Sequence, residues 1–167
     1  MTKHRSLKKR WIPLVVTALV VGMAQQVPVM ASNIWDDVIW EDLESQNIDG
    51  DYAEDIQYSK TRGNHLNFGR TTITKKSSTN VALSGSTIAH HTCDTLYLYL
   101  YLEQEVNGSY GTYKYWRYTG NNLYDLTRSV SVIVPSGYNY RVRGYHAAED
   151  DGNKESRTSL TNGIYVG

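Results

Sequence analysis

The segment AHHTCD, residues 89–94, contains several potential metal ligands. On a β-strand, His91 and Cys93 share one face, and the other polar residues of the segment lie on the opposite face. Two ligands cannot close a tetrahedral zinc site, so His65 or His146 would have to join from another strand. A junction between a loop and a strand, with a half-buried thiol, explains the same residues more simply. We therefore predict no metal site and no cofactor.

Acidic residues raise two further possibilities. Glu103 and Glu105 lie on one strand face roughly 6.8 Å apart, a separation within the range of an inverting glycosidase pair. They flank a hairpin tip, however, which offers no enclosed cleft, so solvated edge charges are predicted. The segment EDDGNKE, residues 149–155, holds oxygen ligands but lacks the spacing of a known calcium loop, which favours a polar hairpin connection. No nucleophile–base arrangement is evident, and we predict no catalytic residues and no enzymatic activity.

The N-terminal segment has the order of a secretory signal peptide. Five Lys and Arg residues within the first ten positions precede an apolar run at 11–24, and Val29 and Ala31 form a small-residue cleavage site. A membrane anchor is the alternative, but the run has about 14 residues against the roughly 20 that a spanning helix needs. We predict cleavage after Ala31, an extracellular protein, and no stable membrane anchor after cleavage.

Charge divides the remaining chain. The whole sequence has 17 basic and 17 acidic residues, so removal of the five basic residues in 1–31 leaves 12 against 17, a net charge of −5. Residues 32–59 carry nine acids and no base. We predict an acidic arm over 32–61, disordered or short-helical and dispensable for stability, before a domain at 62–167. The charge excludes a nucleic-acid partner, and the single cysteine excludes an intrachain disulfide framework.

The elements that must position these residues are strands. From residue 60 onward, apolar residues recur with period two between turn residues, which predicts an all-β, seven-stranded antiparallel β-sandwich. The predicted strands are LNFGRTTIT, VALSG, TLYLYLYLEQ, YGTYKYWRYT, RSVSVIV, YNYRVRGYH and LTNGIYV.

The strand TLYLYLYLEQ, residues 95–104, alternates Leu and Tyr without interruption. Burying Leu stabilises the fold by roughly 1.5–3 kcal/mol, whereas a buried Tyr must also find a partner for its hydroxyl, so the tyrosines should face outward. Asn107-Gly108 predicts a tight hairpin whose register pairs Tyr99 with Trp116. The resulting candidate ligand-binding face comprises Tyr97, Tyr99, Tyr101, Lys114, Trp116 and Tyr118, with Arg141, Arg143 and Tyr145 from the adjoining strand.

The segment PSGYNYRVR, residues 135–143, resembles the corner into the sixth strand of fibronectin type III and related immunoglobulin-like sandwiches. The resemblance implies that Tyr138 is a buried "tyrosine corner", with its hydroxyl bonded back to the connecting loop. The chain departs from that pattern because VALSG has no tryptophan and the immunoglobulin cysteine pair is absent.

The segments RGNHLNFG, AHHTCD, LYLEQEVNGSYGTYKYW, YRVRGYHAA and TNGIYV also resemble a family of small exported proteins of Gram-positive bacteria whose function is unknown. This resemblance implies secretion and a domain that stands alone. It transfers no catalytic or binding residues.

These observations predict a secreted, non-catalytic binding module that contacts an extracellular glycan, cell wall or protein through its exposed Tyr/Trp/Arg face. The alternative is a self-assembling or structural extracellular protein that uses sheet edges or Cys93. A third interpretation is that the aromatic residues are only a cross-strand ladder that stabilises the sheet.

Overall fold

The structure is a computed structural model that describes residues 38, 40–60 and 63–167. The predicted signal peptide and its cleavage site lie outside the described residues. Within the described residues, no helix has the length and apolarity needed to cross a membrane.

The described chain is all-β, as predicted, but it contains eight strands and not seven. They are β1 (Asn47–Ile48), β2 (Tyr52–Tyr58), β3 (Leu66–Ser77), β4 (Asn80–Val106), β5 (Ser109–Ile133), β6 (Tyr138–Asp150), β7 (Asn153–Leu160) and β8 (Gly163–Val166). They form one sheet in the order β1-β8-β6-β4-β3-β2, with β5 on β4 and β7 on β6. The pair β1–β8 is parallel, so the sheet is mixed and the prediction of a wholly antiparallel sheet is wrong.

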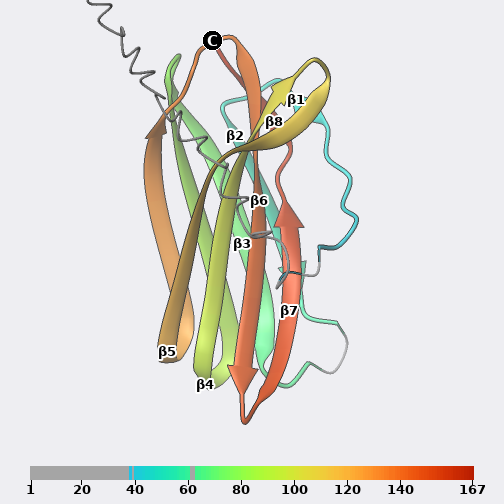
Figure 1. The fold of residues 1–167 in the computed structure, drawn as a ribbon, viewed down its shortest axis with the longest axis vertical. Coiled ribbons are helices and arrows are strands. Elements are labelled where there is room, and N and C mark those ends of the chain that lie inside the picture. The colour runs from blue at the N-terminus through green and yellow to red at the C-terminus, as the bar shows by residue number, and fades with distance from the viewer. Residues whose placement is uncertain (1–37, 39, 61–62) are drawn as a thin grey trace, which may run out of the picture. The chain divides into compact units, whose positions relative to one another are not determined.

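Two of the strands are long and bent. β4 joins the predicted strands VALSG and TLYLYLYLEQ, and β5 joins the next two. Pairing between β4 and β5 is interrupted between Ile88 and Cys93, and there the sheet curls so that its two halves face each other (Figure 1). A Cβ atom on Gly85 would lie only 2.7 Å from a methyl group of Leu100. The first part of β4 therefore packs against its own second part, and a larger residue at position 85 would require the Leu98 and Leu100 side chains to move.

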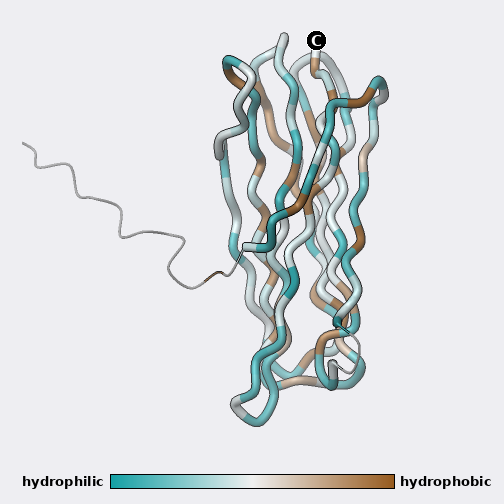
Figure 2. Tube along the Cα trace, turned by 90° about the vertical axis from the view of Figure 1, so that its right-hand side faces the viewer, coloured by the Kyte–Doolittle hydropathy of each residue, from teal (hydrophilic) through white to brown (hydrophobic). Residues whose placement is uncertain are grey.

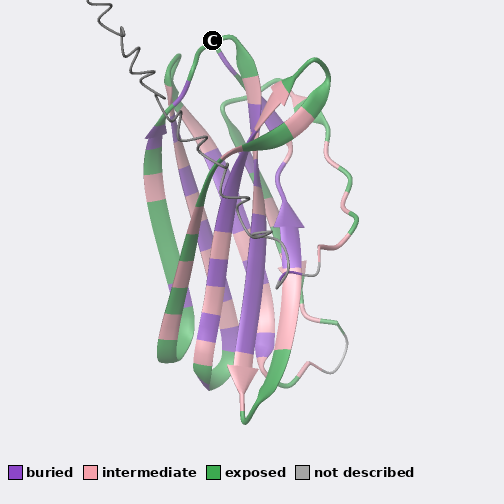
Figure 3. Ribbon diagram, viewed as in Figure 1, coloured by how far each residue is buried: buried purple, intermediate pink, exposed green. Residues whose placement is uncertain are grey.

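The leucine face of β4 fills the core, as predicted. Leu96, Leu98, Leu100 and Leu102 are fully buried and pack with Ile73 and others from the facing half of the sheet. Hydrophobic residues recur at intervals along the strands in Figure 2, which is the pattern of strands with one buried face. In Figure 3, β5 is mostly exposed, whereas the middle of β6 is buried without alternation. Some other part of the chain must therefore cover the second face of β6.

The segment 32–61, expected to be a disordered or short-helical arm, contributes two strands in its described part. β2 pairs with β3 over its full length, from Tyr52 to Tyr58. Its Asp55 carboxylate accepts a hydrogen bond of 2.8 Å from the backbone N–H of Leu160, at the end of β7. The acidic segment thus completes one side of the curled sheet. The strand is hard to recognise in the sequence because Ala53 is its only buried residue, and the positions that share its face, Asp55 and Gln57, are polar.

A polar network crosses the interior between the two halves of the sheet. The His146 side chain is fully buried, with one ring nitrogen 3.1 Å from the Thr87 hydroxyl and the other 2.9 Å from the Ser159 hydroxyl. Glycine at position 69 makes room for this ring, since a Cβ atom there would lie 2.2 Å from it. Burial lowers the pKa of His146 to about 3, so the imidazole is neutral at physiological pH.

Candidate functional site

The register between β4 and β5 decides which side chains share the candidate face. The predicted register holds for the first four pairs after the Asn107-Gly108 turn, from Val106↔Ser109 to Glu103↔Thr112. A bulge at Tyr113 then shifts the pairing by one residue, so that Leu102 faces Lys114. One residue of shift moves every later side chain of β5 to the opposite face of the sheet.

The shift removes three residues from the predicted face. Trp116 and Tyr118 pair with Leu100 and Leu98, share their inward parity, and pack half-buried against the core. The ammonium of Lys114 lies 5.3 Å from the ring centroid of Tyr113 on that same side. None of the three joins the outward tyrosines of β4.

Tyr115 and Arg117 replace them on the outer face. The Arg117 guanidinium carbon lies 4.9 Å from the ring centroid of Tyr99, and Tyr115 stacks on Tyr101 at 5.9 Å.

The remaining predicted residues do lie together on the outer face of β4 and β6. This group, here named the aromatic face, comprises Tyr97, Tyr99, Tyr101, Arg141, Arg143 and Tyr145. Tyr99 and Tyr145 have ring centroids 5.3 Å apart, and Tyr97 lies edge-on to Tyr99 at 6.3 Å. Tyr101 is 1% exposed and Tyr145 3% exposed, so the deep part of this face is covered and not open to solvent.

The cover is the chain's own segment 38–46, here named the strap, of which residue 39 is not described. Val38 packs on Tyr145 and Ala147. The Trp40 ring lies 5.1 Å from that of Tyr101 and 6.5 Å from that of Tyr145, both edge-on. The strap accounts for the burial of both faces of β6.

Polar contacts hold the strap against β7 and against the residues that follow β7. The backbone N–H of Glu41 donates to the Thr158 hydroxyl at 3.1 Å, and Arg157 donates to the Glu41 carboxylate. The Ser45 hydroxyl donates to the carbonyl of Thr161 at 3.0 Å. The strap then leads into β1, which pairs with β8.

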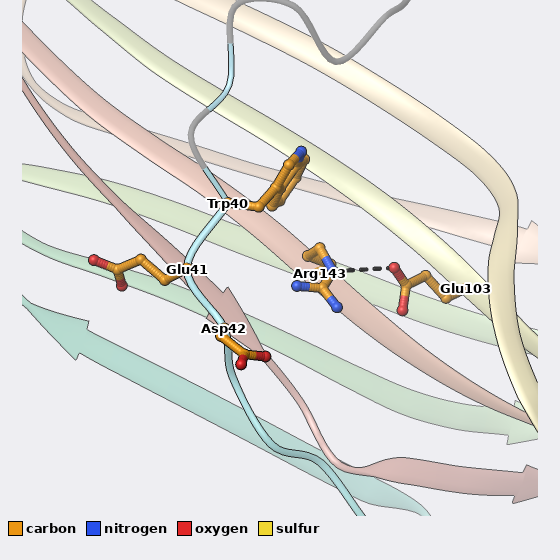
Figure 4. Close-up of a pocket in the computed structure, with 5 residues that line it drawn as sticks. All are labelled: Trp40, Glu41, Asp42, Glu103 and Arg143. Carbon is orange, nitrogen blue, oxygen red and sulfur yellow. Dashed lines mark hydrogen bonds and ion pairs between the residues drawn. The ribbon is translucent and has the colours of Figure 1, made fainter.

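A shallow pocket of about 430 Å³ lies beside Trp40 and is lined by Trp40, Glu41, Asp42, Glu103 and Arg143. In Figure 4, Arg143 lies between Trp40 and Glu103, whereas Glu41 points away from this group. The Arg143 guanidinium carbon is 5.5 Å from the Trp40 ring centroid, and its Nε donates to Glu103 at 3.1 Å. One side of the pocket is aromatic, and Arg143 and Glu103 in its lining are paired with each other.

Glu103 is a buried charge, contrary to the prediction of a solvated edge carboxylate. It is 7% exposed and accepts hydrogen bonds from Arg141 at 2.6 Å and from Arg143 at 3.1 Å. Arg141 also stacks on the Tyr110 ring at 4.0 Å. A carboxylate held between two guanidinium groups orients both of them. Because its oxygens are already engaged in these hydrogen bonds, it is poorly placed for acid–base chemistry.

The tyrosine corner is present two residues later than predicted. Tyr138 is 39% exposed, which contradicts its expected burial, whereas Tyr140 is fully buried. The Tyr140 hydroxyl donates to the carbonyl of Pro135 at 2.8 Å and accepts from Gln104 at 2.9 Å. Burial raises the pKa of Tyr140 to about 12, so the hydroxyl stays protonated. Tyr138 shares the inward parity but stands at the first position of β6, beyond the covered core.

The comparisons with known proteins add one match. Residues 39–164 match the family of unknown function DUF6147. The chain belongs to this family. The matched range includes most of the strap, β1 and β2, so the family domain extends well before residue 62. No curated protein and no solved structure matches the chain.

The site that emerges is an aromatic face with paired arginines that holds an extended acidic segment. Sequence reasoning found the tyrosines of β4 and the two arginines but missed Trp40 and Glu41. The available signal was a set of large apolar residues, including Val38 and Trp40, inside a segment with no basic residue. Large apolar side chains are unexpected in a segment that stays fully exposed to solvent, so their presence indicates that the segment packs against the domain.

Proposed function

We propose that the protein is a secreted, non-catalytic binding module whose aromatic face binds an extended protein segment that carries an aromatic residue beside acidic residues. The observation that carries the proposal is the strap itself. Trp40 lies against Tyr101, Tyr145 and Arg143, and Glu41 is paired with Arg157. The strap thus shows which side chains a ligand of this face would need, namely an aromatic ring beside a carboxylate.

The same contacts favour protein over glycan as the ligand. The segment that covers Tyr101 and Tyr145 in the structure is itself a stretch of polypeptide. Trp40 meets both of them edge-on, a geometry that suits another aromatic side chain. Tyr and Arg together are also the usual components of a protein hot spot.

The test releases the strap in the full chain with Trp40→Ala and Glu41→Ala and offers a labelled peptide of residues 34–46, IWDDVIWEDLESQ. We expect the released variant to bind this peptide. The wild-type protein should bind it at least about tenfold more weakly, because a tethered strap competes at an effective concentration near the millimolar range. Fluorescence anisotropy measures both affinities, and circular dichroism checks the fold.

The matched control is the same peptide with alanine in place of Trp40, which should lose binding to the released variant. A glycan array with the released variant provides the opposing arm. If the folded variant ignores the peptide and binds a sugar, the face is a glycan site. If it binds neither, the aromatic residues serve only to stabilise the sheet.

The exposed edge of β5 favours a second candidate function, self-assembly. Within the described residues, β5 pairs only with β4, which leaves one edge of this 25-residue strand unpaired. It also carries exposed apolar side chains, among them Tyr124 and Ile133. A long free edge can pair with a second chain. Size-exclusion chromatography at rising concentration should show dimers or larger species if this candidate is correct, and a constant monomer if it is not.

A further inference from the structure

The bend between the two halves of β4 brings together three side chains, one from the loop before β3 and two from β4 itself. His65 lies directly before β3, and the β4 residues His91 and Cys93 lie in and beside the interruption of the β4–β5 ladder. The His65 Nδ1 and His91 Nε2 atoms are 3.2 Å apart. Together with the Cys93 Sγ atom, they all lie within 4.8 Å of one another.

We propose that His65, His91 and Cys93 form a binding site for a zinc ion, with water as the fourth ligand. Metal–ligand bonds of about 2.0–2.3 Å in a tetrahedral site place the ligand atoms about 3.3–3.8 Å apart. The three atoms already approach these separations, so small side-chain rotations close the site. Sequence reasoning considered His65 as the missing third ligand, and the fold brings it there.

Local structure fixes the backbone that carries His65 and orients the ring of His91. The Glu155 carboxylate accepts hydrogen bonds from the backbone N–H groups of Asn64, His65 and Leu66 at 2.7, 3.0 and 2.9 Å, which fixes the loop that carries His65. On His91, the Nδ1 atom lies 2.9 Å from the carbonyl of Thr92. A proton on Nδ1 donates to that carbonyl and leaves the Nε2 lone pair directed at the cluster, an arrangement typical of metal-bound histidine.

The chemistry of the donor set selects the metal. Two imidazole nitrogens and one thiolate suit a borderline-soft ion such as Zn²⁺ and do not suit Ca²⁺ or Mg²⁺. Nearby carboxylates favour a cation: Asp150 Oδ2 lies 3.9 Å from the His91 ring. His91 is exposed and Cys93 is buried, so the ion would enter from the histidine side and the fourth position would face solvent.

Cobalt reports on the site directly, because a thiolate ligand gives Co²⁺ a charge-transfer band in the near ultraviolet. We expect the full-length protein, kept reduced, to bind one Co²⁺ with that band and to exchange it for Zn²⁺. Cys93→Ser should abolish the band. His65→Ala and His91→Ala should each weaken Zn²⁺ binding by at least about tenfold, the lower bound of losses seen even for residues that only orient a ligand.

His90→Ala is the matched control. His90 is the exposed neighbour of His91 in the sequence, so its removal should leave the affinity unchanged if the named residues hold the metal. His91 is itself exposed, which makes His91→Ala the variant least subject to misfolding. A protein that takes up no Co²⁺ or Zn²⁺ at micromolar concentration would overturn the proposal. So would binding that survives both Cys93→Ser and His91→Ala, or that depends on His90.

Discussion

At the scale of single residues, His146 links the fold to pH. Its pKa of about 3, lowered by burial, lies well below the ordinary value near 6.5. Below about pH 6.5 the unfolded chain takes up a proton that the folded chain refuses. The stability contributed by this group is therefore complete above that pH and is lost as the pH falls toward 3.

We expect the free energy of unfolding to fall by about 2 kcal/mol between about pH 7 and about pH 5. Urea denaturation at a series of pH values measures this. His146→Gln keeps hydrogen-bonding groups for Thr87 and Ser159 but does not titrate, so its unfolding free energy should be nearly flat across the same window. An equal slope in both proteins would show that His146 is not the group responsible.

The corner hydroxyl of Tyr140 provides a second prediction at this scale. Tyr140→Phe removes the donor to Pro135 and leaves that carbonyl and Gln104 without their partner, which should cost about 1–2 kcal/mol of stability. Tyr138→Phe is the matched control, and because Tyr138 is exposed it should leave the denaturation midpoint unchanged. The reverse result would restore Tyr138 as the corner residue.

At the scale of elements, the acidic segment separates into a removable part and a structural part. A chain that begins at Asn47 loses the strap but keeps β1 and β2, and should lose about 1–3 kcal/mol from the uncovered apolar surface. A chain that begins at Lys60 also loses β2, which pairs along its whole length with β3 and hydrogen-bonds to β7. We expect only the second truncation to abolish cooperative thermal unfolding. If both chains unfold alike, residues 47–59 are dispensable, as the sequence alone would predict.

The elements also show what the sequence can and cannot predict. The alternation of Leu and Tyr in β4 correctly predicts its buried face, and Asn107-Gly108 correctly predicts the turn and the first four pairs. The bulge at Tyr113 inserts one extra residue into the pairing, which the period-two pattern of β5 does not reveal. The placement of Trp116 and Tyr118 was wrong for that reason alone.

The candidate site could be predicted only in part from the sequence, for a related reason. Alternation identifies the outward tyrosines and arginines but does not identify what covers them, since a cover distant in the sequence leaves no periodic signal in the strand. Strand β1 was not predicted because two residues are too few to show a pattern. Strand β7 was not predicted because its sequence, NKESRTSL, is polar at most positions.

At the scale of the whole molecule, export remains a prediction. N-terminal sequencing of protein recovered from the culture medium should give Ser32 as the first residue, because Val29 and Ala31 provide the small residues that a signal peptidase requires. A chain that retains Met1 and is found with membranes would contradict this and favour the anchor.

The contacts that fasten the strap join positions about 116 residues apart in the chain, as between Ser45 and Thr161. Closing so long a loop costs more entropy than closing the turn at Asn107-Gly108 and follows it in time. A chain that emerges N-terminal end first cannot seat the strap until residues 158–164 have also appeared. During that interval the tyrosines of β4 can be paired with β6 yet uncovered, open to any other chain nearby.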